Sequence, residues 1–236
     1  MNINTAMAGL YRKPIVLITG AASGIGREIA ARLHLTCRLC LFDFNARTLP
    51  LVAAKFKALH YLVNVADSVS VDTAVSSIIA KTGHIDVVIN CAGVYLDGPV
   101  TDNPPASIKN TLLVNTLGPI NICQSVLPYL KKRKSGLIIN LNSAAALRPR
   151  SECSVYHASK YALNGFSQSL AAEVEPFGIR VTQLFPDIVN TGFSKKGNIK
   201  RNFRHSLDPS AIADLVSYLV KLPPHLTLPE ITLRYY

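Results

Sequence analysis

The segment PIVLITGAASGIGREIAARL, residues 14–33, sets the architecture to expect for the whole chain. Residues 14–18 form a continuous apolar run rich in β-branched side chains that ends at Thr19-Gly20, which predicts a fully buried strand followed by a turn. From residue 25 to residue 33 the apolar side chains recur at helical spacing. A buried strand joined to a helix by a glycine-rich turn is the first half of a βαβ unit.

The same alternation of strand and helix continues to the end of the chain. Further strands are predicted at residues 38–42, 59–63, 85–89, 137–141, 180–185 and 230–233, and helices at residues 46–57, 70–81, 106–132, 155–174 and 209–220. The helical region 106–132 is expected to break near Gly118-Pro119. Because the strands are apolar throughout, they suit a parallel sheet covered by helices on both faces. The sequence therefore predicts an α/β fold, a single-domain, Rossmann-like, doubly wound parallel sheet spanning residues 1–236, with an N-terminal tail at 1–13.

Length and composition fit such a domain. The chain has 236 residues, of which 49% are hydrophobic and 17% charged, enough to bury a sizeable core. It contains no apolar run of transmembrane length, and residues 1–13 lack the apolar centre of a secretory signal. We therefore expect a cytoplasmic protein.

The five cysteines predict neither a disulfide framework nor a metal site. They are Cys37, Cys40, Cys91, Cys123 and Cys153, an odd and scattered set. The first two have CxxC spacing, but they lie in an apolar run that predicts a strand, and no second pair completes a zinc site. We expect reduced, mostly buried thiols and no bound metal.

Two clusters hold much of the net charge of +11. One closes a predicted helix, where cations favour the C-terminal end of the helix dipole, and the other occupies a loop-like stretch. Neither is interleaved with aromatic residues in a nucleic-acid-binding pattern. We expect no nucleic-acid partner, although a basic nucleic-acid-binding protein on the same fold remains an alternative. The clusters are Lys131, Lys132, Arg133 and Lys134, and Lys195, Lys196, Lys200, Arg201 and Arg204.

The turn after the first strand has the composition of a dinucleotide site. Small residues let a pyrophosphate approach the backbone, and the helix N-terminus supplies free N–H groups and a favourable dipole. The glycines are spaced G-x-x-x-G-x-G, so the turn alone is weak evidence. Its candidate cofactor-binding residues are Gly20, Ser23, Gly24, Ile25 and Gly26.

Asp43 ends the second predicted strand, about twenty residues beyond the glycines, as in dinucleotide-binding units. An acidic side chain there can bind the adenosine ribose hydroxyls and would repel a 2′-phosphate. NAD is therefore favoured and NADP remains possible, since Arg47 could swing over a phosphate. The structural alternative for Asp43 is a helix cap.

The stretch SVYHASKYALNG, residues 154–165, places a phenol and an ammonium group four residues apart. If it is helical, Tyr156 and Lys160 share one face. A tyrosine has an unperturbed pKa of about 10, and a positive charge ~5 Å away at an effective dielectric constant of ~20 would lower that pKa by roughly two units. Tyr156 is thus a candidate general acid or base. The alternative is an incidental Tyr and Lys on a surface helix.

Together these motifs resemble the classical short-chain dehydrogenase/reductase family over nearly the whole chain. TGAASGIG at residues 19–26 resembles the family's cofactor turn, and NCAG at residues 90–93 resembles the NNAG motif after its fourth strand. The family's catalytic tetrad is matched by Asn115 in LLVNTLGP, Ser143 in INLNSAAA, and Tyr156 with Lys160 in YHASK.

The resemblance implies hydride transfer between a nicotinamide and a carbonyl or alcohol carbon. Tyr156 would exchange a proton with the substrate oxygen, and Lys160 would lower the pKa of the phenol and hold the nicotinamide ribose. Ser143 would orient the substrate oxygen, and Asn115 would anchor a water that connects Lys160 to solvent. We predict an NAD-preferring oxidoreductase acting on a secondary alcohol or ketone. A catalytically weak, dinucleotide-binding regulatory protein remains an alternative.

The same resemblance implies further cofactor contacts at positions where some residues have changed. Asn64-Val65 stands where the family usually has Asp-Val beside the adenine, and PDIVNT at residues 186–191 resembles the PGxVxT that flanks the nicotinamide amide. Asp187 replaces the glycine there, and it reaches glycine-like dihedral angles only with strain, which leaves the shape of this loop open. The residues carried over are Asn64, Val65, Asn90, Ala92, Gly93, Pro186, Val189 and Thr191.

Residues 192–206 occupy the position of the family's variable substrate loop. The run GFSKKGNIKRNFRH contains five basic residues and His205 but no acid. An anionic substrate, such as a carboxylate or a coenzyme A thioester, would suit it, and a solvated loop is the alternative. The family usually forms homodimers or homotetramers through its two long helices, here residues 119–132 and 155–174.

Overall fold

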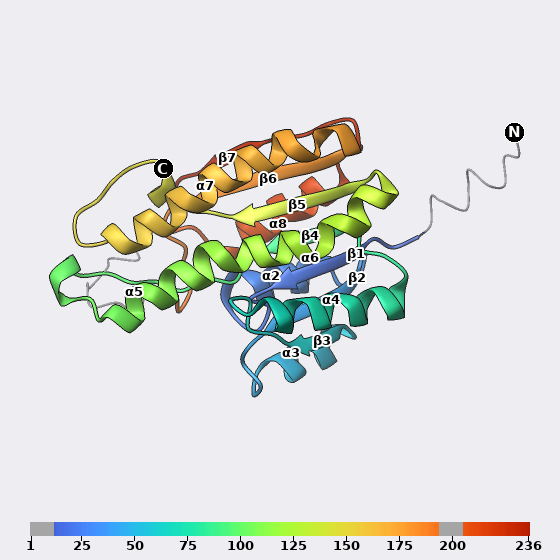
Figure 1. Ribbon diagram of the computed structural model, residues 1–236, viewed down its shortest axis with the longest axis horizontal. Helices are drawn as coiled ribbons and strands as arrows, with labels where there is room; N and C mark the ends of the chain where they lie inside the picture. The colour runs from blue at the N-terminus through green and yellow to red at the C-terminus, as the bar shows by residue number, and fades with distance from the viewer. Residues whose placement is uncertain (1–11, 194–204) are drawn as a thin grey trace, which may run out of the picture.

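Seven parallel strands form one sheet in the order β3-β2-β1-β4-β5-β6-β7 (Figure 1). The computed structural model describes residues 12–193 and 205–236, so most of the predicted tail and the basic residues at 195–204 lie outside the described residues. The strand order reverses between β1 and β4, and doubly wound sheets bind ligands at this switch point, beyond the carboxyl ends of the strands. The strands are β1 (Ile15–Thr19), β2 (Arg38–Asp43), β3 (Leu59–Leu62), β4 (Val87–Asn90), β5 (Gly136–Leu141), β6 (Ile179–Pro186) and β7 (Glu230–Leu233).

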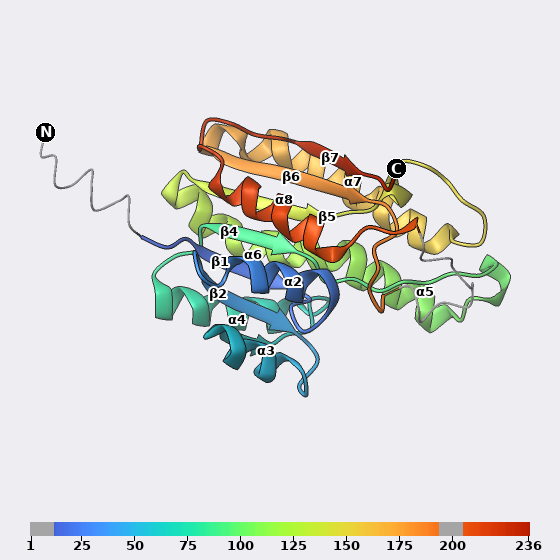
Figure 2. The ribbon, with the colours of Figure 1, turned by 180° about the vertical axis from the view of Figure 1, so that it is seen from behind.

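Helices cover both faces of the sheet, as continuously apolar strands require. One buried cluster joins Val16 and Ile18 of β1 to the helices on the side seen in Figure 2, and a second joins Ile15 and Leu17 to those seen in Figure 1. The predicted α/β, doubly wound fold is therefore confirmed. The first face carries α2 (Gly24–Leu33), α3 (Leu49–Phe56) and α8 (Pro209–Lys221), and the second carries α4 (Ser68–Thr82), α6 (Gly118–Arg133) and α7 (Ser154–Val174).

The predicted break near Gly118-Pro119 is wrong. Helix α5 (Pro105–Leu112) continues through a wide π turn, η3 (Leu113–Leu117), directly into α6. The Gly118 N–H bonds to the carbonyl of Leu113, five residues back, which inserts one extra residue into the helix. Gly118 serves packing here, because a Cβ on it would lie 2.8 Å from Cγ2 of Val65.

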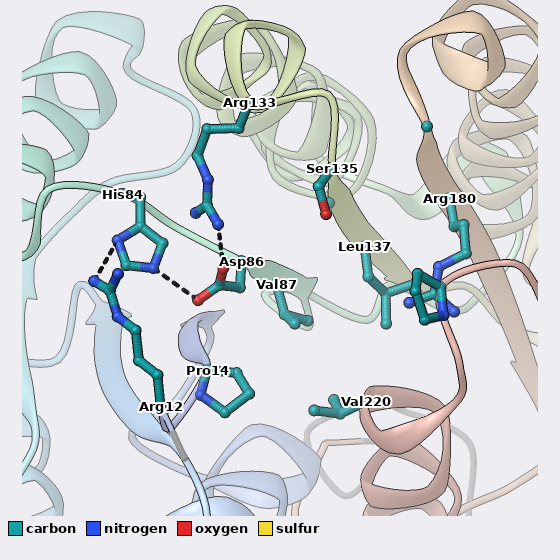
Figure 3. Close-up of a pocket in the computed structure, with 13 residues that line it drawn as sticks. Arg12, Pro14, His84, Asp86, Val87, Arg133, Ser135, Leu137, Arg180 and Val220 are labelled. Carbon is teal, nitrogen blue, oxygen red and sulfur yellow. Dashed lines mark hydrogen bonds and ion pairs between the residues drawn. The ribbon is translucent and has the colours of Figure 1, made fainter. Parts of the chain in front are cut away.

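The amino ends of the strands surround a cavity of about 280 Å³ at the edge opposite the switch point (Figure 3). Asp86, just before β4, is bonded by the N–H of Ile15 at 2.8 Å, by Arg133 Nη2 at 2.9 Å and by His84 Nε2 at 3.1 Å. Arg12 Nη2 in turn lies 2.9 Å from His84 Nδ1. Because α4 and α6 end at this edge, the cations also offset the negative ends of their dipoles. This network fixes the start of β1.

The five cysteines are free thiols. Cys37 packs in the cluster that contains α2, and Cys40 packs in the cluster that contains α4. The two cysteines of the CxxC pair therefore face opposite sides of the sheet, and their thiols cannot bind the same metal ion. None of the helices within residues 12–193 and 205–236 has the length and apolar character to cross a membrane.

Candidate active site

The glycine-rich turn between β1 and α2 lies at the carboxyl edge of the sheet. Gly20 and Gly24 have φ angles of +67° and +52°, in the left-handed region that favours glycine. Gly26 is required for a different reason, because a Cβ on it would collide with the carbonyl oxygen of Gly20. The three glycines therefore let the chain turn tightly enough for α2 to begin directly beside the end of β1.

The start of α2 fits a pyrophosphate. Ser23 is the N-cap residue, yet no side chain caps this helix, and its first turn has no acidic residue. The N–H groups of Ala21 and Ala22 are turned toward β2, where they bond to the carbonyl of Phe42 at 3.2 Å and to Asp43 Oδ2 at 2.9 Å. The N–H groups of the first turn of α2 are left to bind an anion. The donor set thus suits the dinucleotide that the sequence implies.

Asp43, the last residue of β2, is bonded into the same turn. Its Oδ2 accepts from the N–H of Ala22, and its Oδ1 accepts from the N–H of Asn45, both at 2.9 Å. The helix-cap alternative is wrong, because α3 begins at Leu49 with Thr48 as its N-cap. A carboxylate oxygen has more than one acceptor position, so each oxygen of Asp43 can still accept from a ribose hydroxyl.

Three of the other predicted cofactor residues follow the ends of β3 and β4. Asn64 is exposed, and its Oδ1 accepts from the N–H of Ala66 at 3.1 Å. Val65 is buried against the start of α6. After β4, the N–H groups of Cys91 and Ala92 both donate to Thr19 Oγ1 at 3.0 Å. Thr19 thus joins β1 and β4 at the switch point, although no role was predicted for it.

Asn90 and Gly93 differ in their position relative to the cofactor site. The side chain of Asn90 is buried and donates to Asn140 Oδ1 at 2.9 Å, so it is directed to the neighbouring strand β5. A cofactor could meet Asn90 only through its main chain. Gly93 borders the site, because a Cβ on it would lie 3.3 Å from Asn115 Oδ1 and 3.7 Å from the ring of Phe193.

The segment after β6 folds back beside the glycine turn. The N–H of Asp187 donates to the carbonyl of Leu233 at 2.9 Å, and its Oδ1 accepts from the N–H of Ile188 at 2.9 Å. Asp187 has no positive φ angle, so the strain expected from replacing a glycine does not arise. Thr191 lies 3.7 Å from the position of a Cβ on Gly24, which places this segment against the turn. Of the other two predicted residues, Pro186 ends β6 and Val189 pairs with Leu207.

Tyr156, Lys160 and Ser143 converge beyond the carboxyl end of β5. Tyr156 and Lys160 lie on one face of α7, with Lys160 Nζ 6.0 Å from the centre of the phenol ring. Lys160 Nζ donates to the carbonyl of Leu141, the last residue of β5, at 2.9 Å. The Ser143 hydroxyl bonds with the phenol and accepts from the N–H of Ala145 at 3.1 Å. A phenol, an ammonium group and a hydroxyl therefore share one corner of the site.

Burial dominates the electrostatics of this corner. Tyr156 and Lys160 are only 8% and 4% exposed. Burial raises the pKa of Tyr156 to about 12, against the opposing effect of the hydrogen bond with Ser143. Burial also lowers the pKa of Lys160 to about 8. The expected fall in the phenol pKa is thus wrong for the protein alone, because burial penalises the phenolate more than its neighbours stabilise it.

Asn115 lies in the π turn and is fully buried. Its Oδ1 accepts from the N–H of Val94 at 2.8 Å, and its Nδ2 donates to the carbonyl of Val94 at 2.9 Å and to Ser159 Oγ at 3.1 Å. Both polar atoms of the side-chain amide therefore already bond to protein groups. Pro119 has no N–H to give to the carbonyl four residues back, which is that of Asn115. A water at this residue would be held by that carbonyl rather than by the side chain.

Three further residues border the phenol; Phe193 belongs to the predicted substrate loop at 192–206, whereas Tyr95 and Arg150 were not predicted from the sequence. The Tyr95 ring lies 5.0 Å from the Tyr156 ring in an edge-on arrangement. The Phe193 ring lies 6.4 Å from that of Tyr156 and 6.0 Å from that of Tyr95. Arg150 Nη2 donates to Tyr95 Oη at 3.3 Å. These residues come from three segments far apart in the chain, so no local spacing could have grouped them.

Comparison with known proteins is consistent with this arrangement. A family model described as short chain dehydrogenase matches residues 14–202. An uncharacterised oxidoreductase of Staphylococcus epidermidis is 32% identical over 226 residues, which cover 94% of this chain and 97% of that protein. A 3-ketodihydrosphingosine reductase of Bacteroides thetaiotaomicron is 35% identical over 185 residues, covering 78% of this chain and 67% of the relative.

Solved structures share the fold across nearly the whole chain. An alcohol dehydrogenase from the archaeon Thermococcus sibiricus, complexed with 5-hydroxy-NADP, has a TM-score of 0.87 and 25% identity and covers 94% of this chain and 96% of its own. A metagenomic short-chain oxidoreductase in complex with NADP has a TM-score of 0.83 and 26% identity, with coverage of 96% and 98%.

Proposed function

The chain belongs to the short-chain dehydrogenase family of oxidoreductases, and from that membership we propose that it transfers a hydride between NAD(H) and the carbon of a secondary alcohol or ketone. The observation that carries the proposal is the convergence of Tyr156, Lys160 and Ser143 beside a glycine-rich turn that fits a pyrophosphate. Residues 1–236 would act as a single dinucleotide-binding domain.

Each of the four predicted catalytic residues has a role that its surroundings support. When bound, the nicotinamide accepts or supplies the hydride. Tyr156 Oη gives a proton to the substrate oxygen during reduction and takes it back during oxidation. Ser143 holds that oxygen beside the phenol, and Lys160, fixed by the carbonyl of Leu141, replenishes the proton. The Asn115 carbonyl holds the water that links Lys160 to solvent.

The cofactor contacts we propose follow the carboxyl edge of the sheet. The first turn of α2 binds the pyrophosphate, the segment after β3 borders the adenine, and the segment after β6 borders the nicotinamide amide. The residues are Gly20, Ser23, Gly24, Ile25, Gly26, Asp43, Asn64, Val65, Asn90, Ala92, Gly93, Tyr156, Lys160, Pro186, Val189 and Thr191.

The preference for NAD over NADP rests on Asp43. Its carboxylate is fixed by two backbone N–H groups at the end of β2, so it cannot easily rotate away from a 2′-phosphate. The solved relatives named above are complexed with NADP or a derivative of it, which makes this residue the place to test the preference.

Asp43→Asn should shift the preference toward the phosphorylated cofactor. Removing one negative charge beside the 2′-position relieves repulsion, so the ratio of the NADPH to the NADH dissociation constant should fall at least about tenfold. Fluorescence titration with each cofactor measures the two constants, and Asp72→Asn, an exposed carboxylate on α4, is the matched control. An unchanged ratio, or a wild-type protein that binds NADPH more tightly, would remove Asp43 from cofactor selection.

The proposal as a whole is tested by binding and turnover together. The purified protein is titrated with NADH and then assayed with a panel of secondary alcohols and ketones. Turnover of members of the panel supports the proposal. Tight NADH binding without turnover would instead favour a regulatory protein, and salt-sensitive nucleic-acid binding that NADH leaves unchanged would favour a nucleic-acid binder.

We also propose a homodimer or homotetramer formed through α6 and α7. The outer face of α7 is lined by small exposed residues. Gly165, in the middle of that 21-residue helix, has no atom within 4 Å of the position of its missing Cβ. A helix-interior glycine is about 1 kcal/mol less favourable than alanine, and close approach of a second helix would account for it. The small residues are Ala158, Ala162, Gly165, Ser169 and Ala172.

Gly165→Leu should therefore convert the oligomer into smaller species without unfolding it. The Cβ of the new side chain has open space around it, so the leucine can extend outward, where it would hold a partner helix away. Light scattering after size-exclusion chromatography measures the mass, and Gly165→Ala is the conservative control, which should retain the oligomer. A wild-type monomer, or an oligomer unaffected by leucine, would show that α7 is not the interface.

A further inference from the structure

Arg150 lies at the edge of the candidate active site on the segment that joins β5 to α7. Its Nη2 donates to Tyr95 Oη at 3.3 Å and to Cys153 Sγ at 3.2 Å, and Tyr95 Oη and Cys153 Sγ are themselves 3.1 Å apart. The Tyr95 ring in turn stands edge-on to Tyr156, with 5.0 Å between ring centres. The guanidinium is therefore separated from the catalytic phenol by the width of one aromatic ring.

The charge of Arg150 reaches the reacting group and is not neutralised locally. The charge of Arg150 lowers the pKa of Tyr156, although burial, Ser143 and Cys153 affect that pKa more. Burial lowers the pKa of the neighbouring His157, and the charge of Arg150 adds to that effect. The ion pairs found within residues 12–193 and 205–236 do not include Arg150. Its hydrogen bonds to other described residues use Nη2, so Nη1 and Nε can donate to a ligand.

Three acidic residues from the neighbouring segments line a different space. Asp97, Asp102 and Glu152 line a separate cavity of about 310 Å³. Neither Arg150 nor Tyr156 is among the residues that line it. These carboxylates therefore do not share a cavity with Arg150 or Tyr156.

Two aromatic rings also border this space. Tyr95 and Phe193 stand 6.0 Å apart between ring centres, and both lie beside the ring of Tyr156. Rings of this kind accommodate a short hydrocarbon segment, while an arginine without a carboxylate partner suits planar, two-point recognition of a carboxylate. Within the described residues, this side of the site thus combines apolar rings with the cationic guanidinium of Arg150.

We propose that Arg150 is a specificity-determining residue, which binds the carboxylate of an oxo-acid or hydroxy-acid substrate whose reacting carbon lies at Tyr156. This inference rests on the proposed function and names its substrate class. In the reducing direction the carbonyl carbon gains the hydride and the oxygen gains the proton of Tyr156, so an oxo acid becomes a hydroxy acid and its carboxylate is unchanged. The carboxylate acts only as a handle.

The test compares each acid with its own uncharged ester. Steady-state kcat/KM is measured with NADH for 2-, 3- and 4-oxo acids of four to six carbons and for their methyl esters. In Arg150→Gln the acid-to-ester ratio of kcat/KM should fall about 10- to 100-fold, as expected for loss of a charged hydrogen-bonding partner that only the acid can use. Arg150→Lys should recover part of the ratio, because it keeps the charge but not the two-point geometry.

Arg148→Gln is the matched control, since Arg148 is exposed on the same segment two residues away and should leave the ratio unchanged. If wild type turns over esters or simple ketones but Arg150→Gln leaves the ratio unchanged, the inference is overturned while the proposed function stands. If no compound is turned over, calorimetric titration of the NADH complex with the same acids decides. Acid binding lost in Arg150→Gln supports the inference, and acid binding that is absent or independent of Arg150 overturns it.

Discussion

Tyr156→Phe is expected to lower kcat by about 10³-fold and to leave the NADH dissociation constant within a factor of about two, because the lost hydroxyl transfers a proton and the remaining ring still packs. The phenylalanine ring keeps the edge-on contacts with Tyr95 and Phe193, so the site should keep its shape. Steady-state kinetics and fluorescence titration measure the two quantities. Tyr161→Phe is the control, since Tyr161 lies on the same helix but is 45% exposed.

The pH dependence of the wild-type enzyme supplies a second readout of the same residue. Oxidation of an alcohol needs the phenolate and reduction of a ketone needs the phenol. Because burial raises the pKa of Tyr156 to about 12 in the protein alone, kcat/KM for oxidation should rise across the alkaline range, while that for reduction should hold and then fall. Full turnover in Tyr156→Phe, or a flat oxidation profile, would remove Tyr156 from the proton transfer.

Lys160→Met is expected to abolish most turnover and yet to make the protein more stable at neutral pH. Burial lowers the pKa of Lys160 from 10.5 to about 8. Between these two values the unfolded chain binds more protons than the folded chain, so wild-type stability should rise with pH across this window. Below it, the folded state bears the full penalty of burying a charge, which corresponds to about 3 kcal/mol.

Methionine removes that penalty, but the variant also loses the hydrogen bond that Lys160 Nζ gives to the carbonyl of Leu141, which offsets part of the gain in stability. Urea denaturation should therefore show Lys160→Met to be more stable than wild type by up to about 3 kcal/mol at pH 7, with the difference closing toward pH 10. Lys132→Met, at an exposed lysine on α6, should show neither effect. A destabilised Lys160→Met at pH 7, or a gap that widens with pH, would contradict the sign of this prediction.

The sequence predicted most of the fold because each strand and helix has its own local signal. Every predicted strand and helix is present with ends shifted by at most three residues, apart from the long helical region. The family membership was also predicted, since its motifs lie at the ends of predicted parallel strands, which meet at one edge of the sheet. The spacing of Tyr156 and Lys160 gave their shared helix face directly.

What the sequence could not predict depends on packing between distant segments. Gly118-Pro119 has the composition of a helix break, but packing against Val65 favours a continuous helix with a π turn. The raised pKa of Tyr156 follows from burial by elements that a helical spacing does not include. Arg150 and Tyr95 are 55 residues apart in the chain, so neither could be assigned to the site before the fold was known.

The π turn at Leu113–Leu117 corresponds to one extra residue, and hence one extra codon, within an otherwise continuous helix. One extra residue rotates everything before it by about 100° relative to everything after it. Loss of that codon would leave the strands of the sheet in place, but it would turn α5 and the residues of the π turn, Asn115 among them, about the helix axis. With the role proposed here for the Asn115 carbonyl, a one-residue deletion at this point would keep the architecture and remove the link between Lys160 and solvent.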